Sequence, residues 1–160
     1  MKKALVIALS LLLVGFVVLL ALMIPRIEKV DQQYSALLIS RETGEIKDTT
    51  VTVNGEWKSR RIGKAKLEFT GRFQVSDLEY TISDTWETST DLKKDSDIKS
   101  LMGFLTYKSD AGVLEAAVLY ANEDRSAFVF SDSDVTVVIP ADNEEDARRI
   151  CEELGVAYPG

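Results

Sequence analysis

The side chains that could carry out chemistry are few, because the 160 residues include no histidine and a single cysteine, Cys151. Without histidine the chain cannot build a Ser-His-Asp triad, a histidine-activated cysteine or a histidine-ligated zinc, copper or haem site. Ser96 and Lys99 have the spacing of the Ser-x-x-Lys motif, in which a lysine deprotonates a serine. The Ser-Asp-Asn and Lys-Thr-Gly elements that accompany this motif in penicillin-binding proteins are missing. The chain also has no glycine-rich nucleotide loop. We therefore predict no catalytic residues, no cofactor and no enzymatic activity.

Two pairs of aspartates could offer oxygen ligands to calcium: Asp95 with Asp97, and Asp132 with Asp134. Neither segment continues as an EF-hand loop, because the glutamate required at its last ligand position is missing. Acidic side chains at turns commonly accept hydrogen bonds from nearby backbone N–H groups instead. We therefore predict no metal site. Cys151 falls on the apolar face of a predicted helix and is expected to be a packed, inert thiol.

The strongest candidate for a binding surface is the basic segment Trp57–Lys66, which carries five positive charges and no acidic residue. Residues 25–75 have a net charge of +3 and residues 76–160 a net charge of −12, so the chain is electrically polarised. If the segment faces a bilayer, each cation contributes about 1 kcal/mol of attraction to anionic headgroups. A solvated hairpin with its cations on the outward side is the alternative interpretation. The possible interaction surface comprises Trp57, Lys58, Arg60, Arg61, Lys64, Lys66 and Trp86.

Charge and aromatic content narrow the choice of partner further. The net charge of −7 argues against nucleic acid, because a protein that binds phosphates needs a basic surface. Tyr80, Tyr107 and Tyr120, with the two tryptophans, could stack on a sugar or a peptide. Aromatic residues that are in phase with a strand pattern are more often part of a core.

Residues 4–24 form an unbroken apolar run of 21 residues whose only polar side chain is Ser10. A helix of this length spans about 31 Å, which matches a hydrocarbon core of about 30 Å. A cleaved secretory signal is the alternative, but it would end in small residues, whereas Leu22-Met23-Ile24 precede Pro25 here. We therefore predict an uncleaved signal anchor at 1–29 with its membrane span at 4–24. A short linker at 30–33 and a domain at 34–160 follow it.

The orientation of this anchor rests on charges close to the span. Lys2 and Lys3 before it nearly balance Arg26 and Lys29 after it, and the tail that precedes the span is short. This favours an N-terminus inside and a domain outside the cell membrane. A single cysteine and no Asn-x-Ser/Thr site fit a bacterial envelope protein with one membrane span.

Beyond the linker the hydrophobic period changes from that of a helix to two, which is typical of half-buried strands. We predict a first strand at 34–41, and Asn54-Gly55 has the sequence of a two-residue hairpin turn. Residues 65–75 alternate throughout, which predicts one long strand with a bend, bulge or close approach at Gly71. The alternation continues over residues 78–86.

The second half of the domain begins after a polar segment at 87–97, which we predict to be a loop. Residues 101–105 and 116–121 are apolar without clean alternation, which predicts strands that are covered on both faces. Two further strands are expected at 128–130 and 135–139, and a capped amphipathic helix at 142–154. The sequence thus predicts a mainly β fold: an antiparallel β-sandwich or small barrel of about eight strands with one C-terminal helix.

These features favour a membrane-anchored, non-catalytic interaction or assembly module of the cell envelope. Its partners would be the lipid bilayer through residues 4–24 and a neighbouring membrane or envelope protein, with possible contact to anionic headgroups. The alternative is a β-barrel that binds a small apolar ligand or lipid in a cavity lined by Leu101, Phe104, Val118 and Phe128. An enzyme that uses only carboxylates, serine or lysine is the third hypothesis, since the sequence cannot pair its 26 acidic residues.

Overall fold

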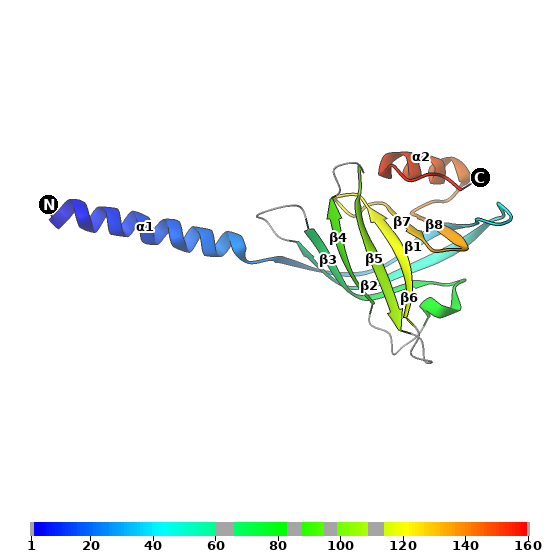
Figure 1. Cartoon of the computed structure of the whole chain (residues 1–160), viewed down its shortest axis with the longest axis horizontal. Coiled ribbons are helices and arrows are strands. Elements are labelled where there is room, and N and C mark those ends of the chain that lie inside the picture. The colour runs from blue at the N-terminus through cyan, green and yellow to red at the C-terminus, as the bar shows by residue number, and fades with distance from the viewer. Residues whose placement is uncertain (1, 60–65, 83–87, 95–98, 109–113, 160) are drawn as a thin grey trace.

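The computed structural model describes residues 2–59, 66–82, 88–94, 99–108 and 114–159, without the side chains of 2–9, 22–23, 108 and 114–116. In this part of the chain eight strands form a closed antiparallel barrel in chain order, and β8 pairs back to β1 (Figure 1). Of the two predicted architectures, the barrel is therefore confirmed. The strands are β1 (Arg26–Ser40), β2 (Ile46–Ser59), β3 (Lys66–Val75), β4 (Thr88–Lys94), β5 (Leu101–Lys108), β6 (Leu114–Ala121), β7 (Phe128–Ser131) and β8 (Val135–Ile139).

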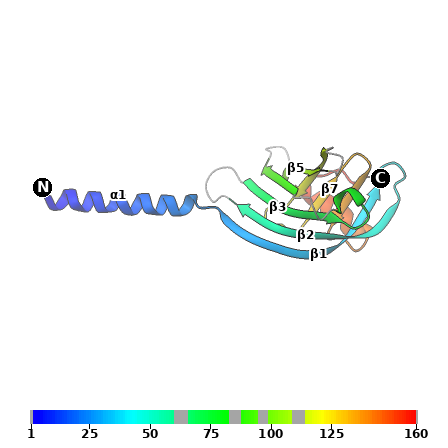
Figure 2. The same cartoon turned by 90° about the horizontal axis from the view of Figure 1, so that it is seen from below.

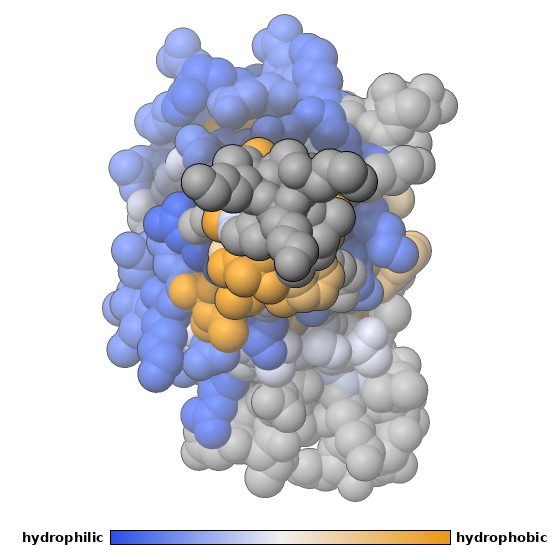
Figure 3. Space-filling view, turned by 90° about the vertical axis from the view of Figure 1, so that its left-hand side faces the viewer, coloured by the Kyte–Doolittle hydropathy of each residue, from blue (hydrophilic) through white to orange (hydrophobic). Residues whose placement is uncertain are grey.

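The N-terminal helix α1 (Lys2–Met23) points away from one end of the barrel (Figure 2). Its large side chains between Leu11 and Leu20 are between 48% and 75% exposed. In the view along this helix, apolar colour gathers around it, while the described barrel surface beside it is mainly hydrophilic (Figure 3). No helix in the described part of the chain is both long enough and apolar enough to cross a membrane.

The start of the barrel differs from the predicted boundaries. Residues 30–33, predicted as a linker, lie inside β1, which begins at Arg26. The predicted hairpin at Asn54-Gly55 is also wrong, because β2 continues through these residues. Residues 26–33 carry no clear hydrophobic alternation because most of their side chains are polar and exposed, so pairing with β2 rather than burial makes this segment a strand.

Gly55 and Gly71 face each other in the β2–β3 ladder, where the two strands come unusually close. A Cβ atom at Gly55 would lie 2.4 Å from the carbonyl oxygen of Thr70, and one at Gly71 would lie 2.3 Å from that of Asn54. Gly71 also has a φ of +153°, which side-chain-bearing residues rarely adopt. The predicted close approach at Gly71 is confirmed, and Gly55 serves the same contact rather than a turn.

The middle of the chain contains two further corrections. Residues 79–81 form a short 3-10 helix instead of continuing the strand pattern, and β4 lies within the predicted loop at 87–97. Thr81 closes the turn after β3, because its hydroxyl accepts a hydrogen bond from the Val75 N–H and donates to backbone carbonyls. The sequence analysis missed β4 because two of its three buried side chains are threonines, Thr88 and Thr90. A search for alternating hydrophobic residues does not detect them.

Side chains that alternate along every strand fill the interior of the barrel. Phe73 stacks with Phe130 at a ring-centroid distance of 6.0 Å, and Tyr107 packs edge-on against Phe130. The buried Tyr107 hydroxyl donates a 2.9 Å hydrogen bond to the Phe73 carbonyl, and its burial raises the pKa of this phenol. These contacts join β3, β5 and β7 across the barrel.

The C-terminal helix α2 (Glu144–Leu154) covers the outer face of β7 and β8, close to the junction with β1. Asn143 caps its start by accepting a 2.9 Å hydrogen bond from the Asp146 N–H, and Gly155 ends it in a left-handed conformation. The capped helix predicted at 142–154 is therefore confirmed, and it begins at Glu144. Cys151 is buried on the inner face of α2, as predicted, and burial raises the pKa of its thiol to about 11.

The expectation that both faces are covered is wrong for β5 and holds only in part for β6, where Tyr120 packs against the buried cluster under α2. On β5, Leu101 and Leu105 are buried inside the barrel, whereas Phe104 points outward and is 61% exposed. Val118 on β6 is half-buried. In a closed barrel with a single packed helix, strands away from the helix have one face in solvent.

We predict that Gly71→Ala lowers the free energy of unfolding by at least about 2 kcal/mol, because a Cβ atom would collide with backbone in a strained conformation. Gly44→Ala is the matched control, since Gly44 also has a positive φ but a Cβ atom there would have no neighbour within 4 Å. The control should cost about 1 kcal/mol. Denaturant unfolding of the full-length chain, followed by tryptophan fluorescence, measures both values. Equal losses would contradict the close approach of β2 and β3.

Candidate functional site

The barrel closes over only part of the length of β1. On one side β1 pairs with β2 at fourteen positions, from Arg26 to Ile39. On the other side it pairs with β8 at four positions, from Leu37 to Ser40. Within the described residues, no strand pairs with positions 26–36 on that second side. We call the resulting gap between residues 26–34 of β1 and the β6–β7 turn (122–127) the seam.

Backbone hydrogen-bonding groups of β1 line this seam. The Ser35 carbonyl accepts a hydrogen bond from the Ala141 N–H, and the Arg41 N–H donates to the Asp134 carbonyl. Both bonds show that the odd-numbered residues of β1 direct their backbone N–H and C=O groups toward β8. Because the N–H and C=O of one residue share a side in an antiparallel strand, Ile27, Lys29, Asp31 and Gln33 direct theirs into the seam.

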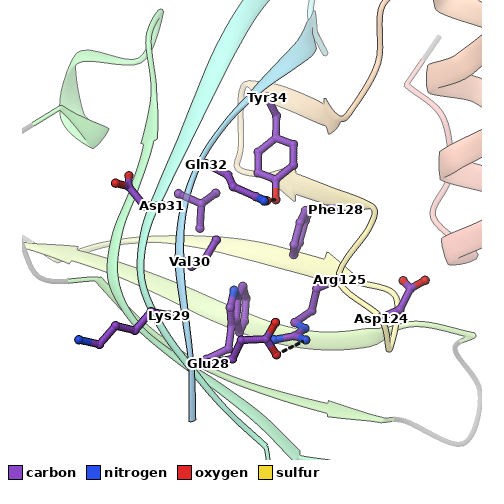
Figure 4. Close-up of a pocket in the computed structure, with 11 residues that line it drawn as sticks. Glu28, Lys29, Val30, Asp31, Gln32, Tyr34, Asp124, Arg125 and Phe128 are labelled. Atoms are coloured by element: carbon purple, nitrogen blue, oxygen red, sulfur yellow. Dashed lines mark hydrogen bonds and ion pairs between the residues drawn. The ribbon is translucent and has the colours of Figure 1, made fainter.

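A cavity of about 340 Å³ lies at the seam (Figure 4). Most of its wall comes from β1, and β2, the β6–β7 turn and β7 complete it. The lining residues are Glu28, Lys29, Val30, Asp31, Gln32, Tyr34, Val53, Trp57, Asp124, Arg125 and Phe128.

An ion pair crosses the seam at the cavity. Arg125 in the β6–β7 turn donates a 2.8 Å hydrogen bond to the Glu28 carboxylate on β1, drawn as the dashed line in Figure 4. This hydrogen bond and the nearby positive charge hold the pKa of Glu28 below its usual range. The Arg125 side chain is 25% exposed and the Glu28 side chain 47% exposed, so the pair is accessible to water. It is therefore a weak contact that links two segments without sealing the gap.

Three aromatic side chains form the floor of the cavity. Trp57 stacks against Phe128 at 6.0 Å between ring centroids, and Tyr34 meets Phe128 edge-on at 6.3 Å. Partial burial raises the pKa of the Tyr34 phenol, which donates a hydrogen bond to the Gln32 side chain. The cavity thus has an apolar floor and a polar, charged rim.

The structure separates the residues of the predicted basic surface. Trp57 is 3% exposed and lies inside the barrel, so it does not present its ring on an outer surface as predicted. The alternation of β2 explains this, because Val51, Val53 and Trp57 point inward. Lys58 is half-buried, and Lys66 pairs with Glu68 at 2.7 Å and Asp91 at 3.1 Å. Arg60, Arg61, Lys64 and Trp86 lie outside the described residues.

The candidate calcium ligands and the Ser-x-x-Lys motif do not form a site in the described part of the chain either. Asp132 accepts hydrogen bonds from the N–H groups of Asp134 and Val135 and from the Tyr80 hydroxyl, so it caps a turn. Among the described residues, no group of three or more acidic or cysteine side chains could hold a metal ion. Asp95, Asp97 and Ser96 lie outside the described residues, so the Ser-x-x-Lys motif has no described geometry.

Sequence reasoning misses the seam altogether. Its rim residues lie in and beside the predicted linker, and Arg125 lies between the strands predicted at 116–121 and 128–130. One signal could have found it. The last expected strand covers only residues 135–139, whereas the first expected strand at 34–41 is longer and follows a polar stretch that could extend it. Matching these lengths requires knowing that the first and last strands are neighbours.

We predict that Arg125→Gln raises the pKa of Glu28 toward its usual value, because the hydrogen bond and the cation that lower it are removed. In the wild-type protein, the stabilisation from this pair is present above the usual glutamate pKa and is lost as the pH falls through the lowered pKa. An NMR titration of the Glu28 carboxyl carbon measures the change. Arg149→Gln, which removes an exposed ion pair with Asp146, is the control and should leave Glu28 unaffected. An unchanged Glu28 pKa in Arg125→Gln would contradict the contact across the seam.

The site is therefore equipped to bind through backbone groups, an aromatic floor and a charged rim. Comparison of the chain with protein-family models, with curated proteins and with solved structures finds no match in any of the three.

Proposed function

We propose that this protein is a membrane-anchored, non-catalytic binding module whose binding site is the seam of its barrel. The observation that carries the proposal is the mismatch between the two sides of β1. Within the described residues, eleven of its fifteen residues have no strand partner on the β8 side, and a cavity lies beside them. Unpaired strand edges are sites where another molecule can form hydrogen bonds with the backbone.

The chemistry of the rim favours binding over catalysis. Glu28 is engaged by Arg125, Asp31 accepts a 2.9 Å hydrogen bond from Asn54, and Asp124 accepts hydrogen bonds from Ser126. The pKa values of Glu28 and Asp124 are held low, which keeps both carboxylates ionised near neutral pH. A general acid at this site would need a raised pKa instead.

The alternative function, a barrel that binds a small apolar ligand, has the architecture that it requires, because the barrel is closed. Among the described residues, those expected to line its cavity do not all face the same side of the barrel wall. Leu101 and Phe128 are buried in the packed interior, whereas Phe104 is exposed on the outside. The cavity at the seam has a charged rim, which favours a partner that offers polar groups over a wholly apolar molecule.

We further propose that residues 4–24 anchor the barrel to a cell membrane, with the barrel on the outer side. Support comes from the apolar sequence of this segment and from the exposure of its described side chains. Such a surface is costly in water and favourable in lipid. The short distance between Met23 and the start of β1 would hold the seam close to the bilayer.

The anchor is tested by introducing charge into α1. We predict that the double substitution Leu12→Glu and Phe16→Glu moves the protein from the membrane fraction to the soluble fraction, because each carboxylate at the centre of a bilayer costs about 3 kcal/mol. Ile46→Glu, at an exposed apolar residue of the barrel, is the matched control and should stay in the membrane fraction. Membranes are washed with alkaline carbonate and the chain is quantified in both fractions. Wild-type protein in the soluble fraction would overturn the anchor.

The binding function is tested by photo-crosslinking in intact cells. A photoreactive amino acid is placed at Gln33 beside the seam and, separately, at Glu152, which is exposed on α2. We predict a discrete adduct from Gln33 and none from Glu152, because only the former lies next to unpaired backbone. The absence of an adduct from both positions would overturn the binding module.

A further inference from the structure

We infer that the seam takes up an extended segment of a different protein, which adds a strand to the barrel along residues 27–33 of β1. This inference rests on the proposed function, because it names the partner of the proposed binding site. The added strand would lie between β1 and the β6–β7 turn, in the position that β8 would occupy if it continued beyond Ile139.

The first argument comes from the backbone of β1. Ile27, Lys29, Asp31 and Gln33 each direct one donor and one acceptor into the seam, as the parity of the β1–β8 bonds requires. Alternate residues of a strand are about 7 Å apart, so these groups form a row with a fixed repeat. Another extended backbone presents donors and acceptors with the same repeat, whereas a compact small molecule can satisfy only one or two of them. The chemistry of the edge therefore selects a polypeptide.

The second argument comes from the cavity. Side chains of an added strand would alternate between the inner and outer faces of the barrel, as those of β1 do. An inward side chain would enter the cavity above Tyr34, Trp57 and Phe128, whose rings form an apolar floor. The segment that fits thus carries a large apolar or aromatic residue at its inward position.

Charge on the outer face specifies the segment further. The side chains of Lys29 and Asp31 point away from Phe128, on the opposite side of β1 (Figure 4). Neighbouring residues on an added strand would lie directly beside them, where opposite charges are favourable and like charges are not. The partner segment should therefore place an acidic residue next to Lys29 and a basic residue next to Asp31.

A second copy of this chain meets the charge requirement but not the geometry. Antiparallel pairing of two β1 strands about Val30 would set Lys29 of each copy opposite Asp31 of the other. Because α1 leads into β1 from one end, such a pair would send the two helices in opposite directions (Figure 2). With α1 as the proposed membrane anchor, two copies in one membrane could not adopt this arrangement, so we infer that the partner is a different protein.

The Glu28–Arg125 ion pair does not prevent entry. It is water-accessible and joins two side chains rather than two backbones, so an incoming strand can displace it at little cost. Both groups would then be available to polar side chains of the partner.

The test uses proline, which removes one backbone donor without changing the pairing on the other side of the strand. The N–H of Lys29 faces the seam, so Lys29→Pro leaves the hydrogen bonds between β1 and β2 in place. Lys29→Gln removes the charge and keeps the N–H, so it measures the contribution of the charge separately from that of the backbone donor. Folding of each variant is checked by the resistance of buried Cys151 to a thiol reagent.

We expect Lys29→Pro to reduce the adduct formed from the photoreactive residue at Gln33 about tenfold, because a buried acceptor on the partner loses its donor. Lys29→Gln should change the adduct by no more than about twofold, the size expected for one exposed ion pair. In a second experiment the photoreactive residue is placed at position 29 and the proline at position 33. Gln33→Pro should then reduce the adduct yield by a similar factor.

Three results would overturn the inference. Full adduct yield in both proline variants, each with Cys151 protected, would show that the edge accepts no strand, although the binding module would stand. An adduct from Glu152 alone would place the binding site elsewhere on the barrel. An adduct with the mass of two copies of this chain would replace the foreign partner with self-association.

Discussion

Closure of a β-barrel requires the first and last strands to pair, and in this protein those two strands differ greatly in length. β1 has fifteen residues and β8 has five, so closure is complete at one end and absent at the other. Backbone groups that face an unpaired edge must be satisfied by water or by another molecule. The open part of β1, the cavity beside it and the Glu28–Arg125 pair across it all follow from this difference in length.

The closed part of the junction is held from both faces. Inside, Ala36, Val137 and Ile139 belong to the packed interior of the barrel; outside, Leu37 and Val138 belong to the same buried cluster as Ile150 of α2. β1 therefore changes character along its length, from exposed polar residues near α1 to residues buried on both sides near α2. This gradient separates a packed scaffold from the exposed edge that we propose as the binding site.

The position of Trp57 changes the interpretation of the basic segment. As an interior residue it contributes to the floor of the cavity and stacks on Phe128, so its role is to shape the seam from within. Lys66, the other described end of the segment, is engaged by two carboxylates. The recognition that we propose therefore rests on directional hydrogen bonding by β1 rather than on electrostatic attraction, with charge as a secondary determinant.

Sequence alone determined the features that depend on local patterns: the N-terminal helix, the alternating strands, the capped helix over Glu144–Leu154, the burial of Cys151 and the close approach at Gly71. It missed β4, whose inward threonines carry no hydrophobic signal, and it mistook Asn54-Gly55 for a turn because that dipeptide suits both a hairpin and a close strand contact. Only the tertiary structure decided which strands are neighbours. The pairing of β1 with β8 joins residues about one hundred positions apart, and their unequal lengths create the seam. No local pattern encodes that site, because it is a property of two distant segments placed side by side.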